Sequence, residues 1–148
     1  MSNLLRRILS GLVYVLLFLF AILFSKESYI VLTSLFGLLT IWEFSKIIKL
    51  KGLISYIFFC LALFLMLKRP ESYAVVVILV ITIISSLFLV YYLFLKKEIT
   101  FLNDRSKLGL LIRYLIFPMT FLILLPIHRG SYNPNLIISL LILIWVND

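Results

Sequence analysis

The residues with the clearest chemical potential are Asn147 and Asp148, which follow a nearly unbroken apolar run, Leu136–Val146. A helix rises about 1.5 Å per residue and needs about 20 apolar residues to cross the hydrocarbon core of a bilayer. The run is too short for this, so Asp148 would lie inside the membrane or just below it. A charge at that depth is costly and usually has a functional or paired role. We therefore expect the chain to be the front part of a longer membrane protein.

Two interpretations of these polar residues remain open from the residues alone. The carboxylate of Asp148 is suited to binding Mg²⁺, which prefers oxygen ligands and often bridges to substrate phosphates. It is equally compatible with an ordinary acidic helix end at the membrane boundary. Asn147 is suited either to orienting a phosphate or nucleotide, or to a hydrogen bond between packed helices.

Two further charged residues lie in or near apolar segments. Arg113 lies five residues into an expected span, about Leu108–Ile127. Its guanidinium can extend back to the membrane boundary, or it can hold a lipid phosphate in a bidentate contact. Glu43 either pairs with Arg113 or lies at the boundary beside Lys46, three residues further along the same helix. We favour the second arrangement for Glu43, because lysines already mark that boundary.

Common catalytic motifs are absent from the sequence. It has no Gly-rich phosphate loop, no Gly-x-Ser-x-Gly, no His-Glu-x-x-His and no close pair of carboxylates. Cys60 is the single cysteine, so an internal disulfide is excluded, and we expect it to be a packing residue. His128 is the single histidine and is not expected to bind a metal or take part in catalysis. Because the polar segments between the apolar runs are short, any reaction is expected to occur at or within the membrane.

Composition predicts the elements that position these residues. The chain is 64% hydrophobic and 14% charged, whereas a soluble domain is about half apolar and about a quarter charged. The apolar residues form blocks separated by short polar segments. We predict an all-α fold, a polytopic transmembrane helix bundle of about five complete spans plus a truncated sixth, with no soluble domain. The five expected spans are approximately Ile8–Phe24, Tyr29–Ile48, Leu53–Leu67, Tyr73–Leu95 and Leu108–Ile127, and the sixth helix follows Pro134.

Polar segments between the blocks predict the breaks. Ser25–Ser28 is expected to be a tight turn, and residues 128–134 are expected to form another because glycine and proline interrupt them. Lys68–Glu71, which contains Pro70, is expected to end the third helix. Pro118 is the strongest interruption inside a span. We see no internal repeat or low-complexity tract.

Basic residues predict the orientation of the helices. With a cytoplasmic N-terminus, nine lysines and arginines fall on the inner side and four on the outer side, while Arg113 lies within a span. This imbalance favours an N-terminus inside the cell. The net charge of +8 is spread around the apolar runs instead of forming a stripe, so we expect a lipid bilayer as partner and no nucleic acid.

Several short motifs resemble those of the bacterial phosphatidate cytidylyltransferases, the CDP-diacylglycerol synthase family. They are Arg6-Arg7-Ile8 with Gly11, Trp42-Glu43-Phe44, and above all Ile144-Trp145-Val146-Asn147-Asp148. In that family the last motif continues into a Thr/Ser-x-Ala-Tyr and Gly-Arg stretch, and the family signature lies further on. The resemblance extends over the whole chain, and identifies it as the N-terminal portion of such an enzyme.

The resemblance implies a reaction and its participants. CTP and phosphatidate would give CDP-diacylglycerol and pyrophosphate, with Mg²⁺, at the cytoplasmic face of a bacterial inner membrane. With this resemblance we take Asp148 as the candidate catalytic residue and metal ligand, and we keep Asn147 and Arg113, suggested by their chemistry, as candidate substrate-binding residues. The family also implies a possible homodimer. We expect the 148-residue chain to be inactive by itself. The alternative is a non-catalytic polytopic accessory subunit, and a transporter is disfavoured because no inverted repeat is visible.

Overall fold

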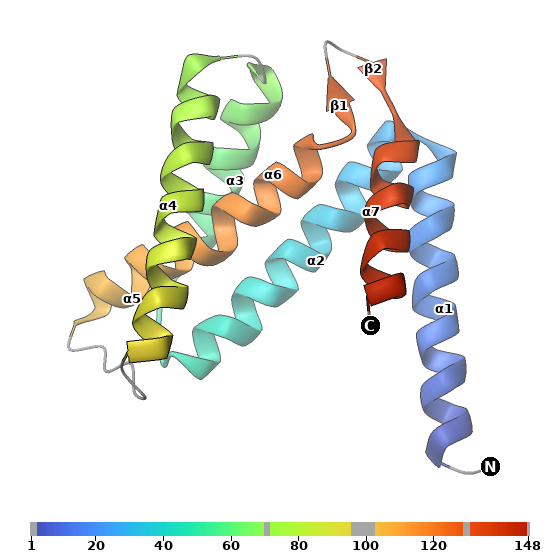
Figure 1. Ribbon diagram of the computed structural model, residues 1–148, viewed down its shortest axis with the longest axis horizontal. Helices are drawn as coiled ribbons and strands as arrows, with labels where there is room; N and C mark the ends of the chain where they lie inside the picture. The colour runs from blue at the N-terminus through green and yellow to red at the C-terminus, as the bar shows by residue number, and fades with distance from the viewer. Residues whose placement is uncertain (1–2, 70–71, 96–102, 129–130, 148) are drawn as a thin grey trace. The chain divides into compact units, whose positions relative to one another are not determined.

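The computed structural model describes residues 3–69, 72–95, 103–128 and 131–147. Within these residues the helices are α1 (Asn3–Phe24), α2 (Lys26–Ile47), α3 (Ile54–Lys68), α4 (Tyr73–Leu95), α5 (Asp104–Leu111), the π-helical turn η1 (Ile112–Ile116), α6 (Phe117–Leu124) and α7 (Pro134–Asn147). Two short strands, β1 (Ile127–His128) and β2 (Ser131–Tyr132), lie between α6 and α7 (Figure 1). The all-α prediction is confirmed, apart from this small hairpin.

Three helical segments of the described chain are long and apolar enough to cross a membrane. They are α2, α4 and the continuous segment Asp104–Leu124, which combines α5, η1 and α6. Gly11–Phe24, α3 and α7 are apolar but shorter. Each of the six apolar runs of the sequence thus corresponds to a helical segment, while the number of complete spans remains a prediction. Thr82 is the buried residue of α4, and the wide apolar surface of this helix is suited to contact with lipid.

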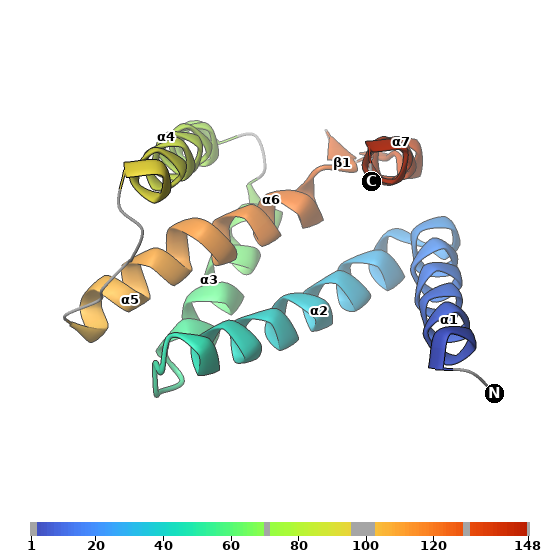
Figure 2. The same cartoon turned by 60° about the horizontal axis from the view of Figure 1, so that its bottom comes forward.

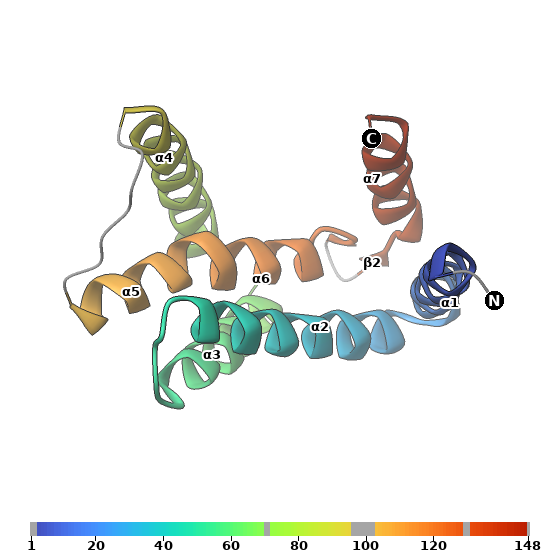
Figure 3. The same ribbon diagram turned by 90° about the horizontal axis from the view of Figure 1, so that it is seen from below.

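The chain divides into two compact units. Unit 1 comprises Met1–Leu35 and Leu125–Asp148, and unit 2 comprises Phe36–Leu124. In unit 1, α7 lies beside α1 (Figure 1). In unit 2, α5, η1 and α6 form one continuous rod that α3 and α4 both contact (Figures 2 and 3). The residues of this rod that are fully buried are Leu111, Ile116, Thr120 and Ile123.

The predicted turn over Ser25–Ser28 was too long. Only Ser25 separates α1 from α2, and Lys26, Glu27 and Ser28 belong to the first turn of α2. The physical reason is reciprocal capping: the Ser28 amide donates to the Ser25 hydroxyl at 3.1 Å, and the Ser25 amide donates to the Ser28 hydroxyl at 3.1 Å. These bonds satisfy amides that a helix start leaves without partners.

The last turn of α1 is capped by hydroxyl groups from other elements. The Ser28 hydroxyl donates to the Ala21 carbonyl at 2.7 Å, and the Tyr132 hydroxyl donates to the Ile22 carbonyl at 2.7 Å. Carbonyls at a helix end need such partners when they are away from water. Burial raises the pKa of Tyr132 above its ordinary value, which keeps this phenol protonated as a donor.

The fifth apolar helix begins earlier than the sequence suggested. It starts at Asp104, not near Leu108, with Asn103 in an extended conformation before it. Asp104 accepts a hydrogen bond from Lys107 at 3.2 Å within the first helical turn. A carboxylate there also interacts favourably with the positive end of the helix dipole. Polar residues therefore form the first turn of this helix.

Pro118 does not interrupt its helix. The π-helical turn η1 precedes it, and the Phe117 amide bonds to the Ile112 carbonyl, five residues back. Proline lacks an amide hydrogen and crowds the carbonyl four residues earlier, and a wider turn accommodates both effects. The Thr120 hydroxyl lies 2.8 Å from the Phe117 carbonyl and satisfies it as a donor. The helix thus continues from Asp104 to Leu124.

The predicted end of the third helix at Lys68–Glu71 is confirmed, because α3 ends at Lys68. Pro70 and Glu71 lie outside the described residues. The predicted turn over residues 128–134 is also present, as the antiparallel hairpin of β1 and β2. The Asn133 amide extends the hairpin by donating to the Pro126 carbonyl at 2.8 Å.

Candidate functional site

The C-terminal end of α2 is shaped by a Schellman motif. The Leu50 amide donates to the Ser45 carbonyl at 2.9 Å, and the Lys49 amide donates to the Lys46 carbonyl at 3.2 Å. Lys49 has a φ of 54°, the left-handed conformation that this motif requires and that glycine usually supplies. Gly52, with a φ of 128°, then turns the chain into α3.

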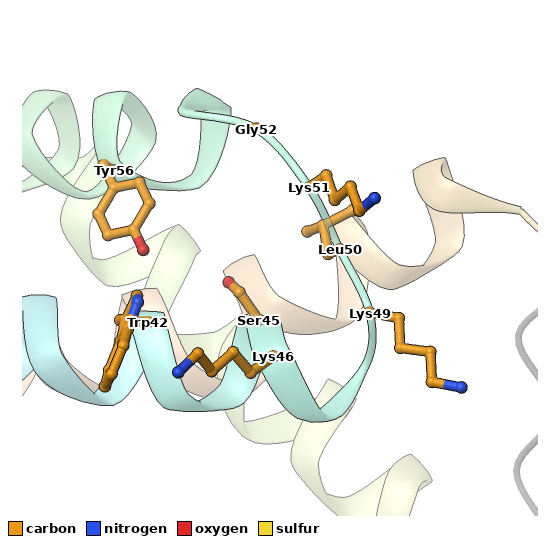
Figure 4. A pocket seen from close by; sticks show the side chains of 8 residues that line it. All are labelled: Trp42, Ser45, Lys46, Lys49, Leu50, Lys51, Gly52 and Tyr56. Carbon is orange, nitrogen blue, oxygen red and sulfur yellow. The ribbon is translucent and has the colours of Figure 1, made fainter.

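A cavity of about 380 Å³ lies at this turn between α2 and α3 (Figure 4). Its polar lining residues are Trp42, Ser45, Lys46, Lys49, Lys51 and Tyr56. The volume falls within the range of about 300–1,000 Å³ that is typical of small-molecule sites. None of the residues that line this cavity is acidic.

Donor groups from both helices face the space between them. Figure 4 shows the Tyr56 hydroxyl pointing from α3 toward α2, and the Ser45 hydroxyl pointing from α2 toward α3. Lys46 extends along α2, and its ammonium lies over the Trp42 ring, 3.7 Å from the centroid. The side chains of Lys49 and Lys51 point outward from the turn in the same view. The lining can therefore donate hydrogen bonds, and its net charge is positive.

The Ser45 hydroxyl is buried and has no hydrogen-bond partner. Other helical hydroxyls in the described chain bond to the carbonyl four residues back, such as Thr33 to Tyr29 at 2.7 Å and Thr40 to Phe36 at 2.7 Å. Ser45 makes no such bond. Leaving a buried hydroxyl without a hydrogen bond costs about 1–3 kcal/mol. A ligand that accepts a hydrogen bond from Ser45 would remove this cost.

Glu43 is exposed near the C-terminal end of α2, one turn before Lys46, which agrees with the favoured arrangement and not with a buried pair. Among the described residues the ion pair found is Lys107–Asp104, at 3.2 Å. The ammonium of Lys46 lies over the ring of Trp42. A lysine ammonium in this position is attracted electrostatically by the indole ring, by about 0.5–1 kcal/mol at an exposed site. Cys60, expected to be a packing residue, is exposed on α3, where its apolar surroundings are suited to lipid contact.

The two predicted site residues that the structure describes, Arg113 and Asn147, belong to different units. Arg113 is exposed in η1, in unit 2, with its guanidinium beside Gly109. Asn147 is exposed at the end of α7, in unit 1. Asp148 lies outside the described residues. The structure therefore defines no geometry that joins the three, and their roles remain predictions.

The structure shows no metal-ligand cluster in the part of the chain that it describes. No group of three or more His, Cys, Asp or Glu residues is close enough there to hold a metal ion. Sequence reasoning also missed the cavity at the α2–α3 turn, because it treated Lys46, Lys49 and Lys51 only as boundary markers. The spacing of Trp42, Ser45 and Lys46 was the available signal, because residues three and four apart lie on one helix face.

The fold and this basic turn define an all-α protein with membrane-spanning character. The sequence model described as the "Cytidylyltransferase family" matches residues 5–148, almost the entire chain. The chain therefore belongs to the cytidylyltransferase family, the family of CDP-diacylglycerol synthases, and the resemblance drawn from its motifs is confirmed. No curated protein and no solved structure matches the chain significantly.

Proposed function

We propose that the chain is the membrane-embedded part of a phosphatidate cytidylyltransferase, which converts CTP and phosphatidate to CDP-diacylglycerol and pyrophosphate. The family match over residues 5–148 carries this proposal. Apolar helices that are suited to holding a lipid substrate in the bilayer support it. The membrane would be a bacterial inner membrane, with the N-terminus in the cytoplasm, about five complete spans, and a homodimer as the possible assembly.

In the proposed reaction, an oxygen of the lipid phosphate forms a bond to the α-phosphorus of CTP, and the bond to pyrophosphate breaks. Negative charge must be neutralised as these phosphates approach. Arg113 would contact the lipid phosphate through its guanidinium, and Asn147 would orient a phosphate or the nucleotide. Asp148 would be a ligand of Mg²⁺, which often combines one or two carboxylates with substrate phosphates and supplies this neutralisation when bound.

The test measures CTP-dependent formation of CDP-diacylglycerol in membranes of cells that express the gene. Asp148→Asn should lower the rate about a hundredfold or more, the effect typical of losing one electrostatic group at a reaction centre. Asp104→Asn is the control, because Asp104 pairs with Lys107 in an exposed helical turn.

Four results are informative. Absence of CTP-dependent product with the unaltered gene would reject the proposed function, and full activity of Asp148→Asn would reject the role of Asp148. The purified 148-residue polypeptide is expected to be inactive in the same assay. If every anionic lipid protected the chain equally in detergent, without preference for phosphatidate, this result would favour a non-catalytic accessory subunit.

A further inference from the structure

The cavity at the α2–α3 turn has the chemistry of an anion site. Three lysines, Lys46, Lys49 and Lys51, lie within six residues and line it, and no acidic residue does. The negative end of the α2 dipole is close by, but so is the positive end of α3, which no side chain caps. Each dipole end is equivalent to roughly half a charge, so the two contributions nearly cancel. The lysines therefore make the electrostatic potential of the cavity positive.

Two uncharged hydroxyl groups, those of Ser45 and Tyr56, can donate directional hydrogen bonds to a bound anion. The Ser45 hydroxyl is buried without a partner, and Figure 4 shows it and the Tyr56 hydroxyl facing the space between the helices. Hydroxyl donors and a lysine ammonium together match the several acceptor oxygens of a phosphate. The cavity, at about 380 Å³, also has room for the group that bears the phosphate.

The position of the cavity indicates where a phosphate would come from. α2 is long and apolar enough to cross a membrane, and a spanning α2 would place its C-terminal end near the membrane boundary. Trp42 and Tyr56 are residue types that favour that boundary. Phosphate groups reach this region as lipid headgroups or as soluble phosphates.

We propose that the α2–α3 turn binds a phosphate group through Ser45, Tyr56 and Lys46, with Lys49 and Lys51 supplying further positive charge. This binding site does not depend on the proposed enzymatic activity, because its test measures occupancy of the cavity and not turnover. The two proposals can therefore fail separately.

The test uses Trp42 as a reporter inside the cavity. The chain has two tryptophans, so Trp145→Phe leaves Trp42 as the single one. This protein would be placed in nanodiscs of neutral phosphatidylcholine and titrated with inorganic phosphate or CTP at constant ionic strength. A second series would use nanodiscs that contain increasing phosphatidate. We expect a saturable change in Trp42 fluorescence in at least one series.

Variants in the same background assign the response to the cavity. Ser45→Ala and Lys46→Gln should each raise the dissociation constant for phosphate about tenfold or more. This is the scale of a lost hydrogen bond to a charged group. Dissociation constants are compared instead of amplitudes, because Lys46 lies on the Trp42 ring. The double variant Lys49→Gln/Lys51→Gln removes the further positive charge of the exposed turn, with little risk to folding. It should also raise the dissociation constant.

Two matched controls share the chemistry but not the location. Ser34 is the other described side chain whose buried hydroxyl has no partner, so Ser34→Ala repeats the deletion outside the cavity lining. Lys68 also lies over an aromatic ring at a helix end, 4.7 Å from the Phe64 centroid, so Lys68→Gln repeats the loss of charge. Neither control should change the dissociation constant.

The outcomes separate the sources of the phosphate. A response to phosphatidate alone identifies a lipid headgroup, a response to the soluble ligands alone identifies a free phosphate, and a response in both series identifies the phosphate itself. The proposal is overturned if no series saturates, or if Ser45→Ala, Lys46→Gln and the double lysine variant all bind as tightly as the parent protein.

Discussion

Individual hydroxyl groups do structural work at the ends of these helices. The Tyr132 hydroxyl is bonded to the Ile22 carbonyl at 2.7 Å, although the two residues are 110 positions apart. Ile22 is fully buried, so water cannot replace the lost donor. The bond thus connects the hairpin to the end of α1 within unit 1.

Removing this bond should destabilise the protein. Tyr132→Phe is expected to lower the free energy of unfolding by about 1–2 kcal/mol, because the Ile22 carbonyl would remain buried without its partner. Unfolding in a denaturing detergent such as sodium dodecyl sulfate measures the change. Tyr73→Phe is the control, because Tyr73 is 91% exposed. Equal stability of the two variants would contradict the prediction.

The ring of Phe59 on α3 packs directly against Gly37 on α2. A Cβ atom on Gly37 would lie 2.6 Å from Cζ of Phe59, a side chain that is only 1% exposed. A glycine at this position leaves room for the large side chain of a neighbouring helix. Gly11 on α1 has nothing within 4 Å of the same position and provides a matched comparison.

Gly37→Ala should therefore lower the free energy of unfolding by about 1–3 kcal/mol, the usual cost of overpacking. Gly11→Ala should be neutral or stabilising by up to about 1 kcal/mol, since alanine is the better helix former. The same detergent unfolding measures both. Adding Phe59→Leu to Gly37→Ala should restore part of the loss, and failure of this rescue would argue against the contact.

The end of α2 offers a second prediction at this scale. Lys49 adopts a left-handed backbone conformation that costs an L-residue roughly 1–2 kcal/mol. Glycine avoids this cost but loses about 0.5–1 kcal/mol more entropy on folding. Lys49→Gly should thus raise the free energy of unfolding by up to about 1 kcal/mol. Lys49→Ala keeps the Cβ atom and should give no gain, and a gain for alanine would show that removal of charge is responsible.

At the scale of the whole molecule, the charge distribution predicts that the α2–α3 turn faces the cytoplasm. In a Cys60→Ser background, Lys51→Cys would mark this turn and Arg69→Cys would mark the opposite end of α3. Both native residues are exposed in the structure. A membrane-impermeant maleimide applied to spheroplasts should label Arg69→Cys directly, and Lys51→Cys only after permeabilisation. The reverse pattern would overturn the predicted orientation.

The sequence by itself determined the helices, most of their ends and the family. In a bilayer, backbone groups must form hydrogen bonds within the chain, and a helix does this through neighbouring residues. Long apolar runs in the sequence therefore predict the helices. The error at Ser25 arose because reciprocal Ser25–Ser28 hydrogen bonds bring polar residues into the first turn of α2. The error at Asp104 arose because the Asp104–Lys107 ion pair lies within the first turn of α5, which hydropathy alone does not assign to a helix. The residues Arg113, Asn147 and Asp148 were chosen by type, which cannot show whether they meet.

Only the tertiary structure decided which distant groups approach one another. The sequence marked Lys46, Lys49 and Lys51 as boundary residues, but the fold makes them the lining of a cavity with Tyr56 of the next helix. The contact of Phe59 with Gly37 likewise depends on how α2 and α3 pack. These relations depend on side-chain shape and on the distance between elements. Neither property is contained in hydropathy or local spacing.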